Sequence, residues 1–185
     1  TFGQCLSNEY EVHIFEKKKE FGEVGAAISV FPNALCVMDE IGLIDAILNT
    51  SGKFENVFLK TEKGNILSKN SPQGDYPVIC MHRADLQTEF DIGYASETYG
   101  RGKLVGIVPI KDGVYGWWAT CNEGFLENDE PEGSKQKLKR LFGNFHHPIP
   151  ELIENTEEIL KNSLSDRIPQ KGWTKGNITL IGDAA

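Results

Sequence analysis

The sequence predicts an α/β fold, in which strands and amphipathic helices follow one another along 185 residues. Three observations carry this prediction. A strand-like alternation over residues 10–16 ends on an acidic residue, and a helical pattern of apolar residues begins at Asn33. Two β-rich runs, residues 104–110 and 114–120, flank an Asp-Gly pair, which is a strong signal for a hairpin. Period-two and period-3.6 patterns in one chain indicate strands and helices together.

The composition is that of an acidic globular protein, with 39% hydrophobic residues and a formal net charge of −8. A negative balance argues against a nucleic-acid partner, because phosphate binding needs lysines and arginines clustered on one face. The basic cluster at residues 135–140 directly follows an acidic run, and we interpret it as solvated surface. The longest uncharged stretch near the N-terminus, residues 24–38, is interrupted by Gly25 and Pro32. We expect no membrane span, which needs about 20 apolar residues.

The four cysteines are widely separated and no pair has the spacing of metal ligands. We therefore expect no metal site. An even number of cysteines could form two disulfides, but Cys36, Cys80 and Cys121 lie in apolar or strand-like surroundings, which favours free thiols. The N-terminal residues contain no basic-then-apolar signal peptide, which predicts a cytoplasmic protein.

The first half of the chain alternates between helical and β-rich segments. Asn33 is a suitable N-cap for a helix that reaches Ile41, and a second short helix is expected over residues 43–48. Residues 54–61 and 65–68 have the alternation of two strands joined by a turn.

The second half holds further elements in the same mixture. We expect a short strand over residues 78–81, then helices over residues 134–145 and 150–155. His146 and His147 point in different directions at a helix end and are expected at the surface. The apolar run at residues 177–181 has the composition of a buried strand.

Taken in order, five segments resemble the FAD-dependent aromatic hydroxylases, the flavoprotein monooxygenases related to para-hydroxybenzoate hydroxylase and to urate hydroxylases. The matching segments are residues 12–17, 25–35, 82–86, 100–118 and 173–185. In the same order, they are similar to that family's second Rossmann strand, small-residue loop, Arg-x-x-Leu element, the sheet that covers the substrate, and second flavin fingerprint. Each motif alone is unspecific, and the ordered combination is specific.

The resemblance implies a Rossmann-like FAD-binding domain interleaved with a mainly β substrate domain. Residues 1–50, 78–90 and 173–185 would form the FAD-binding parts, and residues 51–77 and 91–122 the substrate sheet. A helical connection over residues 123–172 would lead back to the FAD-binding domain.

The resemblance also implies the cofactor residues. Glu16, with Lys17 beside it, would accept hydrogen bonds from the adenosine ribose at a strand end. Arg83 would make charge-assisted bonds to the cofactor, with Gln87 one helical turn further on. At the second fingerprint, Gly182 would allow close backbone approach and Asp183 would accept from a ribityl hydroxyl. Three alternatives stay open: Glu16 as a solvated strand-end residue, Arg83 as a surface ion-pair partner, and Gly182-Asp183 as a tight turn.

In this family the flavin carries the chemistry, through a C4a-hydroperoxide, so no side chain need be a catalyst. The resemblance therefore implies a monooxygenase that consumes NADPH or NADH and O2 and hydroxylates a small aromatic or heteroaromatic substrate. Candidate walls of its pocket are Pro109, Tyr115 and Trp117. Strand alternation places Trp117 and Trp118 on opposite faces of the sheet, so at most one of them faces the flavin.

Three family elements are not found in the sequence. They are the Gly-x-Gly-x-x-Gly turn, expected before Val12, the Asp-Gly element, expected between Phe90 and Asp91, and the helix expected after Ala185. Either the sequence is part of a longer enzyme, or it is a hydroxylase-like binding module without flavin. The substrate and the oligomeric state stay open.

Overall fold

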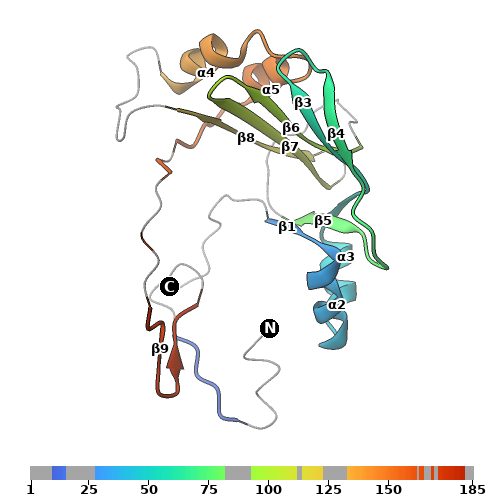
Figure 1. Cartoon of the computed structure of the whole chain (residues 1–185), viewed down its shortest axis with the longest axis vertical. Coiled ribbons are helices and arrows are strands. Elements are labelled where there is room, and N and C mark those ends of the chain that lie inside the picture. The colour runs from blue at the N-terminus through green and yellow to red at the C-terminus, as the bar shows by residue number, and fades with distance from the viewer. Residues whose placement is uncertain are drawn as a thin grey trace.

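The computed structural model describes residues 10–15, 28–81, 93–111, 114–122, 133–161, 163–164, 168 and 171–181. Within these ranges the strands form a five-stranded sheet, a three-stranded sheet and a two-stranded ribbon. Two helices lie over the larger sheet, and two more accompany the three-stranded sheet (Figure 1). The mixed α/β class predicted from the sequence is confirmed.

The five-stranded sheet has the order β4-β3-β6-β7-β8. Its strands β3 and β6 are parallel, and the other neighbours are antiparallel. Both hairpins expected from the sequence are present, as β3–β4 and β7–β8. The strand bounds are Val57–Thr61 (β3), Ile66–Asn70 (β4), Ala95–Gly100 (β6), Lys103–Lys111 (β7) and Val114–Cys121 (β8).

Local chemistry explains two irregularities of this sheet. The β3–β4 turn passes through Gly64 at φ +85°, a left-handed conformation that glycine adopts without a steric penalty. The β7–β8 register shifts between Pro109 and Lys111. Proline has no N–H to donate to the ladder, so a register shift is a favourable place for it in a paired strand.

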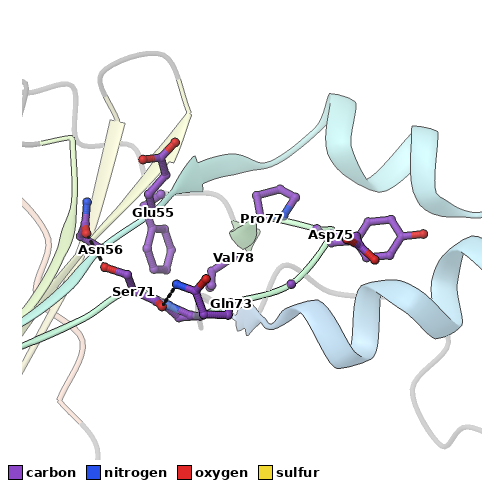
Figure 2. Close-up of a pocket in the computed structure, with 11 residues that line it drawn as sticks. Glu55, Asn56, Ser71, Gln73, Asp75, Pro77 and Val78 are labelled. Carbon is purple, nitrogen blue, oxygen red and sulfur yellow. Dashed lines mark hydrogen bonds between the residues drawn. The ribbon is translucent and has the colours of Figure 1, made fainter.

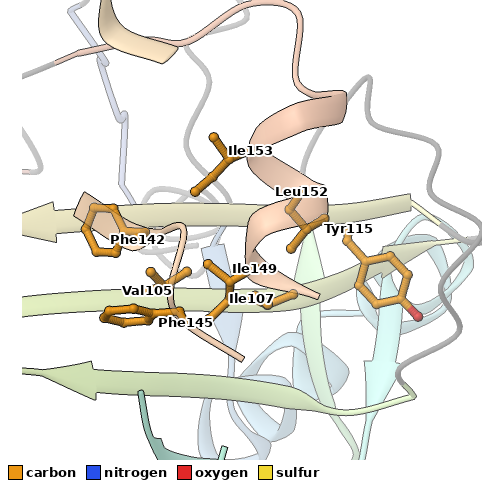
Figure 3. Packing of buried hydrophobic residues seen from close by; sticks show 8 residues of the cluster. All are labelled: Val105, Ile107, Tyr115, Phe142, Phe145, Ile149, Leu152 and Ile153. Atoms are coloured by element: carbon orange, nitrogen blue, oxygen red, sulfur yellow. The ribbon is translucent and has the colours of Figure 1, made fainter. Parts of the chain in front are cut away.

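Helices α4 (Ser134–Phe142) and α5 (Ile149–Asn155) cover one face of the large sheet (Figure 1), and Figure 3 shows the buried side chains at this contact. Their apolar side chains pack on alternate residues of β7 and β8, as period-two geometry requires. This cluster is the larger core of the described chain. Its buried members are Val105, Ile107, Tyr115, Phe142, Phe145, Ile149, Leu152 and Ile153.

The small sheet has the order β1-β5-β2, from β1 (Ile28–Val30), β5 (Val78–Met81) and β2 (Gly52–Phe54). It lies against the large sheet, and a Cβ added at Gly52 would come within 1.9 Å of the Ile110 carbonyl oxygen. Glycine at this position lets the two backbones touch. Strand β2 lies within residues 51–77, which the resemblance assigned to the substrate sheet, but it pairs with β5 of the small sheet. The proposed domain division stays a prediction.

Two helices follow β1. They are α2 (Pro32–Glu40) and α3 (Ile44–Asn49). The first helix is capped by Phe31 and begins at Pro32, so the prediction of Asn33 as N-cap is wrong. Proline suits the first helical position, because its fixed φ is helical and its missing N–H would have no partner there.

Two predicted strands are wrong. Residues 11–15 form no regular element, and Phe15 is 93% exposed. The predicted strand at residues 177–181 is reduced to β10 (Ile178–Thr179), which pairs only with β9 (Thr174–Lys175). Ile178 is 73% exposed there. An apolar run becomes a buried strand only when neighbouring strands cover it, and the described residues supply just this short ribbon.

Two surface predictions also fail. His146 is half-buried beyond the end of α4, where its Nε2 lies 3.0 Å from Thr98 Oγ1. Lys137, expected in a solvated basic cluster, is buried. The burial of His146 depends on this tertiary contact with β6 rather than on local sequence. The helix predicted over residues 134–145 is shorter than expected, and α4 ends at Phe142.

Candidate functional site

The predicted cofactor residues Glu16, Lys17, Arg83, Gln87, Gly182 and Asp183 lie outside the described residues. Their roles therefore stay predictions. The predicted substrate-pocket residues Pro109, Tyr115 and Trp117 lie on the β7–β8 hairpin, which the structure describes.

Tyr115 and Trp117 face the helices. Tyr115 belongs to the buried cluster under α4 and α5, and it pairs across the hairpin with Pro109. Trp117 packs against the same cluster, and its indole Nε1 donates to Thr156 Oγ1 over 3.0 Å. Thr156 in turn donates to the Leu152 carbonyl at the end of α5. The structure therefore gives both aromatic residues a packing role, and their place in a substrate pocket stays a prediction.

The opposite face of the large sheet is a second candidate surface, and we call it the open face. One end of it is covered by the small sheet, where Val108 and Ile110 pack with Phe54 and Val78. Beyond that end, Trp118 and Tyr99 remain exposed by 39% and 42%. Trp117 and Trp118 thus lie on opposite faces, as alternation predicted.

A row of three paired residues crosses the open face. Glu97 of β6 is opposite Gly106 of β7, and Gly106 is opposite Trp118 of β8. A Cβ added at Gly106 would lie 2.0 Å from Cζ2 and 2.2 Å from Cε2 of Trp118. The indole therefore lies across Gly106, in the space that any other residue's side chain would fill.

Glu97 lies in the same row as Trp118, two strands away, and has a phenol as its neighbour. The hydroxyl of Tyr99 donates to Glu97 Oε2 over 2.5 Å, and both residues project from β6 on the same face. The hydrogen bond to the carboxylate, followed by desolvation, raises the pKa of Tyr99. Tyr99 thus stays a hydrogen-bond donor to Glu97 near neutral pH.

A polar cluster is buried on the helix side of the same sheet. Lys60 donates to the Tyr94 hydroxyl over 2.6 Å, with its ammonium 4.4 Å from the Tyr94 ring centroid. Thr98 and His146 lie beside it, and the His146 Nδ1 is 2.5 Å from the His147 carbonyl oxygen. Burial first, and then the charge of Lys60, lower the pKa of His146. These groups satisfy one another and join the sheet to the helical layer.

A shallow hollow lies where the two sheets meet, and it encloses about 400 Å³. Figure 2 shows Gln73 donating to the Ser71 carbonyl oxygen, and Ser71 donating to Asn56. Close by, the Tyr76 hydroxyl donates to Asp39 Oδ2, and this hydrogen bond raises the pKa of Tyr76 to about 12. Two of these three hydrogen bonds tie the loop to Asn56 and to Asp39 of α2, and so they fix the path of the chain around the hollow.

The described residues contain no group of three or more His, Cys, Asp or Glu side chains arranged to hold a metal ion. No helix among those residues has the length and apolar character needed to cross a bilayer. The described cysteines Cys36, Cys80 and Cys121 form no disulfide.

Comparison with known proteins relates the chain to flavoenzymes. The aurachin C monooxygenase/isomerase of Stigmatella aurantiaca is 40% identical over 94 residues, which cover 50% of this chain and 24% of that protein. The 6-hydroxynicotinate 3-monooxygenase of Pseudomonas fluorescens is 21% identical over 275 residues, covering 97% of this chain and 71% of the relative. The resemblance to the flavoprotein monooxygenases is confirmed. No protein-family model matches the chain.

The chain also shares its fold with a solved protein that binds FAD. Klebsiella pneumoniae HpxO, solved in complex with FAD and uric acid, matches with a TM-score of 0.56 at 15% identity. The match covers 73% of this chain and 57% of HpxO. The chain thus spans about a quarter of the aurachin relative and rather more than half of HpxO. The Pseudomonas monooxygenase alignment is longer than this 185-residue chain, so that relative has segments without a counterpart here.

Sequence reasoning missed Glu97 and Tyr99 as site candidates. Strand β6, which carries both, was not predicted as a strand. A signal was present, because Thr98 and Tyr99 have high strand propensity and precede the turn at Gly102, which adopts φ +65°.

Proposed function

We propose that this chain is part of an FAD-dependent monooxygenase that hydroxylates a small aromatic or heteroaromatic substrate, with NADPH or NADH as reductant and O2 as co-substrate. The observation that carries the proposal is the 40% identity to a monooxygenase over half of the chain. The shared fold with HpxO supports it. A cytoplasmic location stays part of the prediction.

The proposed cofactor residues fit FAD by their chemistry. Carboxylates such as Glu16 and Asp183 accept hydrogen bonds from ribose and ribityl hydroxyls, and Arg83 donates to phosphate oxygens. Bound FAD would supply the redox chemistry, taking electrons from the nicotinamide and activating O2. The chain itself would bind the cofactor, exclude water and orient the substrate ring.

We assign the substrate side to the open face of the large sheet, and not to the helix-covered face that carries Pro109, Tyr115 and Trp117. This face presents an exposed indole, Trp118, together with the Tyr99–Glu97 pair. Aromatic rings stack on an indole face, and a carboxylate orients a ring by accepting one hydrogen bond. The helix-covered face is filled by buried apolar side chains, and so it offers no comparable surface.

The test is an absorbance spectrum of the protein purified from its own source, and of this chain expressed alone with added FAD. We expect flavin bands at about 370 and 450 nm. NADPH or NADH consumption with a panel of ring compounds should then identify the reductant and a substrate. A folded, colourless protein that takes up no FAD from either source would contradict the proposal and favour a binding module without flavin.

A further inference from the structure

The open face carries a stacking platform. The indole of Trp118 lies flat across Gly106, whose missing side chain leaves the space that the ring occupies. Trp118 is held there by the β7–β8 ladder and still exposes 39% of its surface. An exposed, fixed indole favours a planar ligand, because offset stacking gains contact area at little conformational cost.

One hydrogen-bond acceptor stands at the edge of this platform. Glu97 is two strands away from Trp118 in the same row, about 10 Å between backbones at the usual strand spacing. The indole extends over the intervening strand and shortens the gap. Tyr99 occupies Oε2 of Glu97, and within the described part of the chain no hydrogen bond is made to Oε1. An ionised carboxylate only accepts, so its partner must present an N–H or O–H donor.

The charges of the sheet are divided between its faces. Three lysines of the five strands, Lys60, Lys69 and Lys103, lie on the helix side, where they contact Tyr94, Phe58 and the Leu141 carbonyl respectively. Among the described side chains of the five strands, Glu97 is the charged residue of the open face. None of these three described lysines lies on the open face, so an anionic ligand there would meet the Glu97 carboxylate without compensation from Lys60, Lys69 or Lys103.

We propose that this site takes a planar aromatic substrate that carries no negative charge and presents an N–H or O–H donor, stacked on Trp118 with its donor bound by Glu97. The proposal rests on the proposed function, in that it makes the open face the substrate side. It goes further by naming the substrate's charge and the residue that selects it.

The experiment measures dissociation constants of three probes of similar size by ligand-observed NMR titration with the full 185-residue chain. The probes are indole, which has an N–H donor, benzothiophene, which has the same shape without a donor, and indole-2-carboxylate, which adds a negative charge. We expect indole to bind about tenfold more tightly than either of the others, the effect of one hydrogen bond to a charged acceptor.

Variants assign this preference to Glu97. Glu97→Gln should reduce the difference between indole and indole-2-carboxylate to less than about threefold, and Glu97→Arg should reverse their order. Glu157→Gln removes an exposed carboxylate from the segment after α5 and should leave all three constants unchanged. Trp118→Ala should weaken the three probes to a similar extent, because stacking does not depend on the donor.

Equal binding of indole and benzothiophene would overturn the proposal. The proposal would also be overturned if Glu97→Gln kept the full preference for indole over indole-2-carboxylate, or if no probe bound at millimolar concentration. Flavin content, read from the absorbance spectrum, is independent of these constants. A flavin-containing protein without probe selectivity overturns this inference alone, whereas a colourless protein with Glu97-dependent selectivity supports the binding preference and contradicts the monooxygenase function.

Discussion

At the scale of single residues, Gly106 decides where an aromatic ring lies. The indole of Trp118 occupies the volume of the absent Cβ, and the atoms would overlap at 2.0 Å if that Cβ were present. No rotation of a methyl group relieves such an overlap, so the indole itself has to move. The platform of the open face therefore depends on a residue that has no side chain.

We predict that Gly106→Ala destabilises the protein by about 1–3 kcal/mol, the usual cost of overpacking. Urea denaturation followed by circular dichroism measures this change. In a Trp118→Ala background the overlap is gone, and the same substitution should then cost much less. An equal cost in both backgrounds would show that the indole does not lie over Gly106.

At the scale of elements, the layer of α4 and α5 holds the large sheet. Leu152 and Ile153 of α5 are each 1% exposed, and the Trp117–Thr156 hydrogen bond ties the end of this helix to β8. Most of the stability of such short helices comes from tertiary packing rather than from intrinsic propensity.

We predict that Leu152→Ala lowers the free energy of unfolding by about 2–5 kcal/mol, because it leaves a cavity in a packed core. The matched control is Leu160→Ala, at a leucine that is 68% exposed, where the change should stay within about 0.5 kcal/mol. Chemical denaturation of both variants makes the comparison. Similar losses at the two sites would contradict the assignment of α5 to the core.

The contact between His146 and β6 makes stability depend on pH. Burial lowers the folded-state pKa of His146 below its ordinary value of 6.5, so the unfolded chain binds the proton more readily. As far as His146 is concerned, the free energy of unfolding should therefore be highest above about pH 6.5, and it should fall as the pH drops from 6.5 through the folded-state pKa.

The measurement is the urea midpoint of the protein and of His146→Gln between pH 7.5 and 5. The variant should lose the part of the slope that lies in this window. The carboxyls of Glu151 and Glu154, whose pKa values are lowered by His147 and Lys139, contribute at more acidic pH, below about 4.5. An unchanged slope in His146→Gln would assign the pH dependence to other groups.

At the scale of the whole molecule, the proposed cofactor site draws on three separate segments, at residues 16–17, 83–87 and 182–183. A flavin that bridges them would make three distant stretches of chain act as one site. We predict that Asp183→Ala weakens FAD binding by about 1–3 kcal/mol, the cost of losing one hydrogen bond to a charged group. Flavin release measured by fluorescence tests this, with Asp45→Ala on α3 as the control, and unchanged affinity would remove Asp183 from the site.

Local patterns were sufficient for much of the fold. The two hairpins, the strand at β5 and the positions of four helices follow from periodicity, turn glycines and prolines, because these features act over a few residues. The resemblance to flavoprotein monooxygenases was likewise readable from the order of short motifs.

Only the tertiary structure decided which residues are buried and which face of the sheet each side chain occupies. The run at residues 177–181 looks like a buried strand, yet Ile178 is exposed, because burial requires neighbouring strands that a local pattern does not contain. Alternation separates Trp117 from Trp118, but only the packing of α4 and α5 shows that Trp117 faces the helices and Trp118 the open face. The row from Glu97 to Trp118 joins three strands by their register, a non-local property that no stretch of sequence encodes by itself.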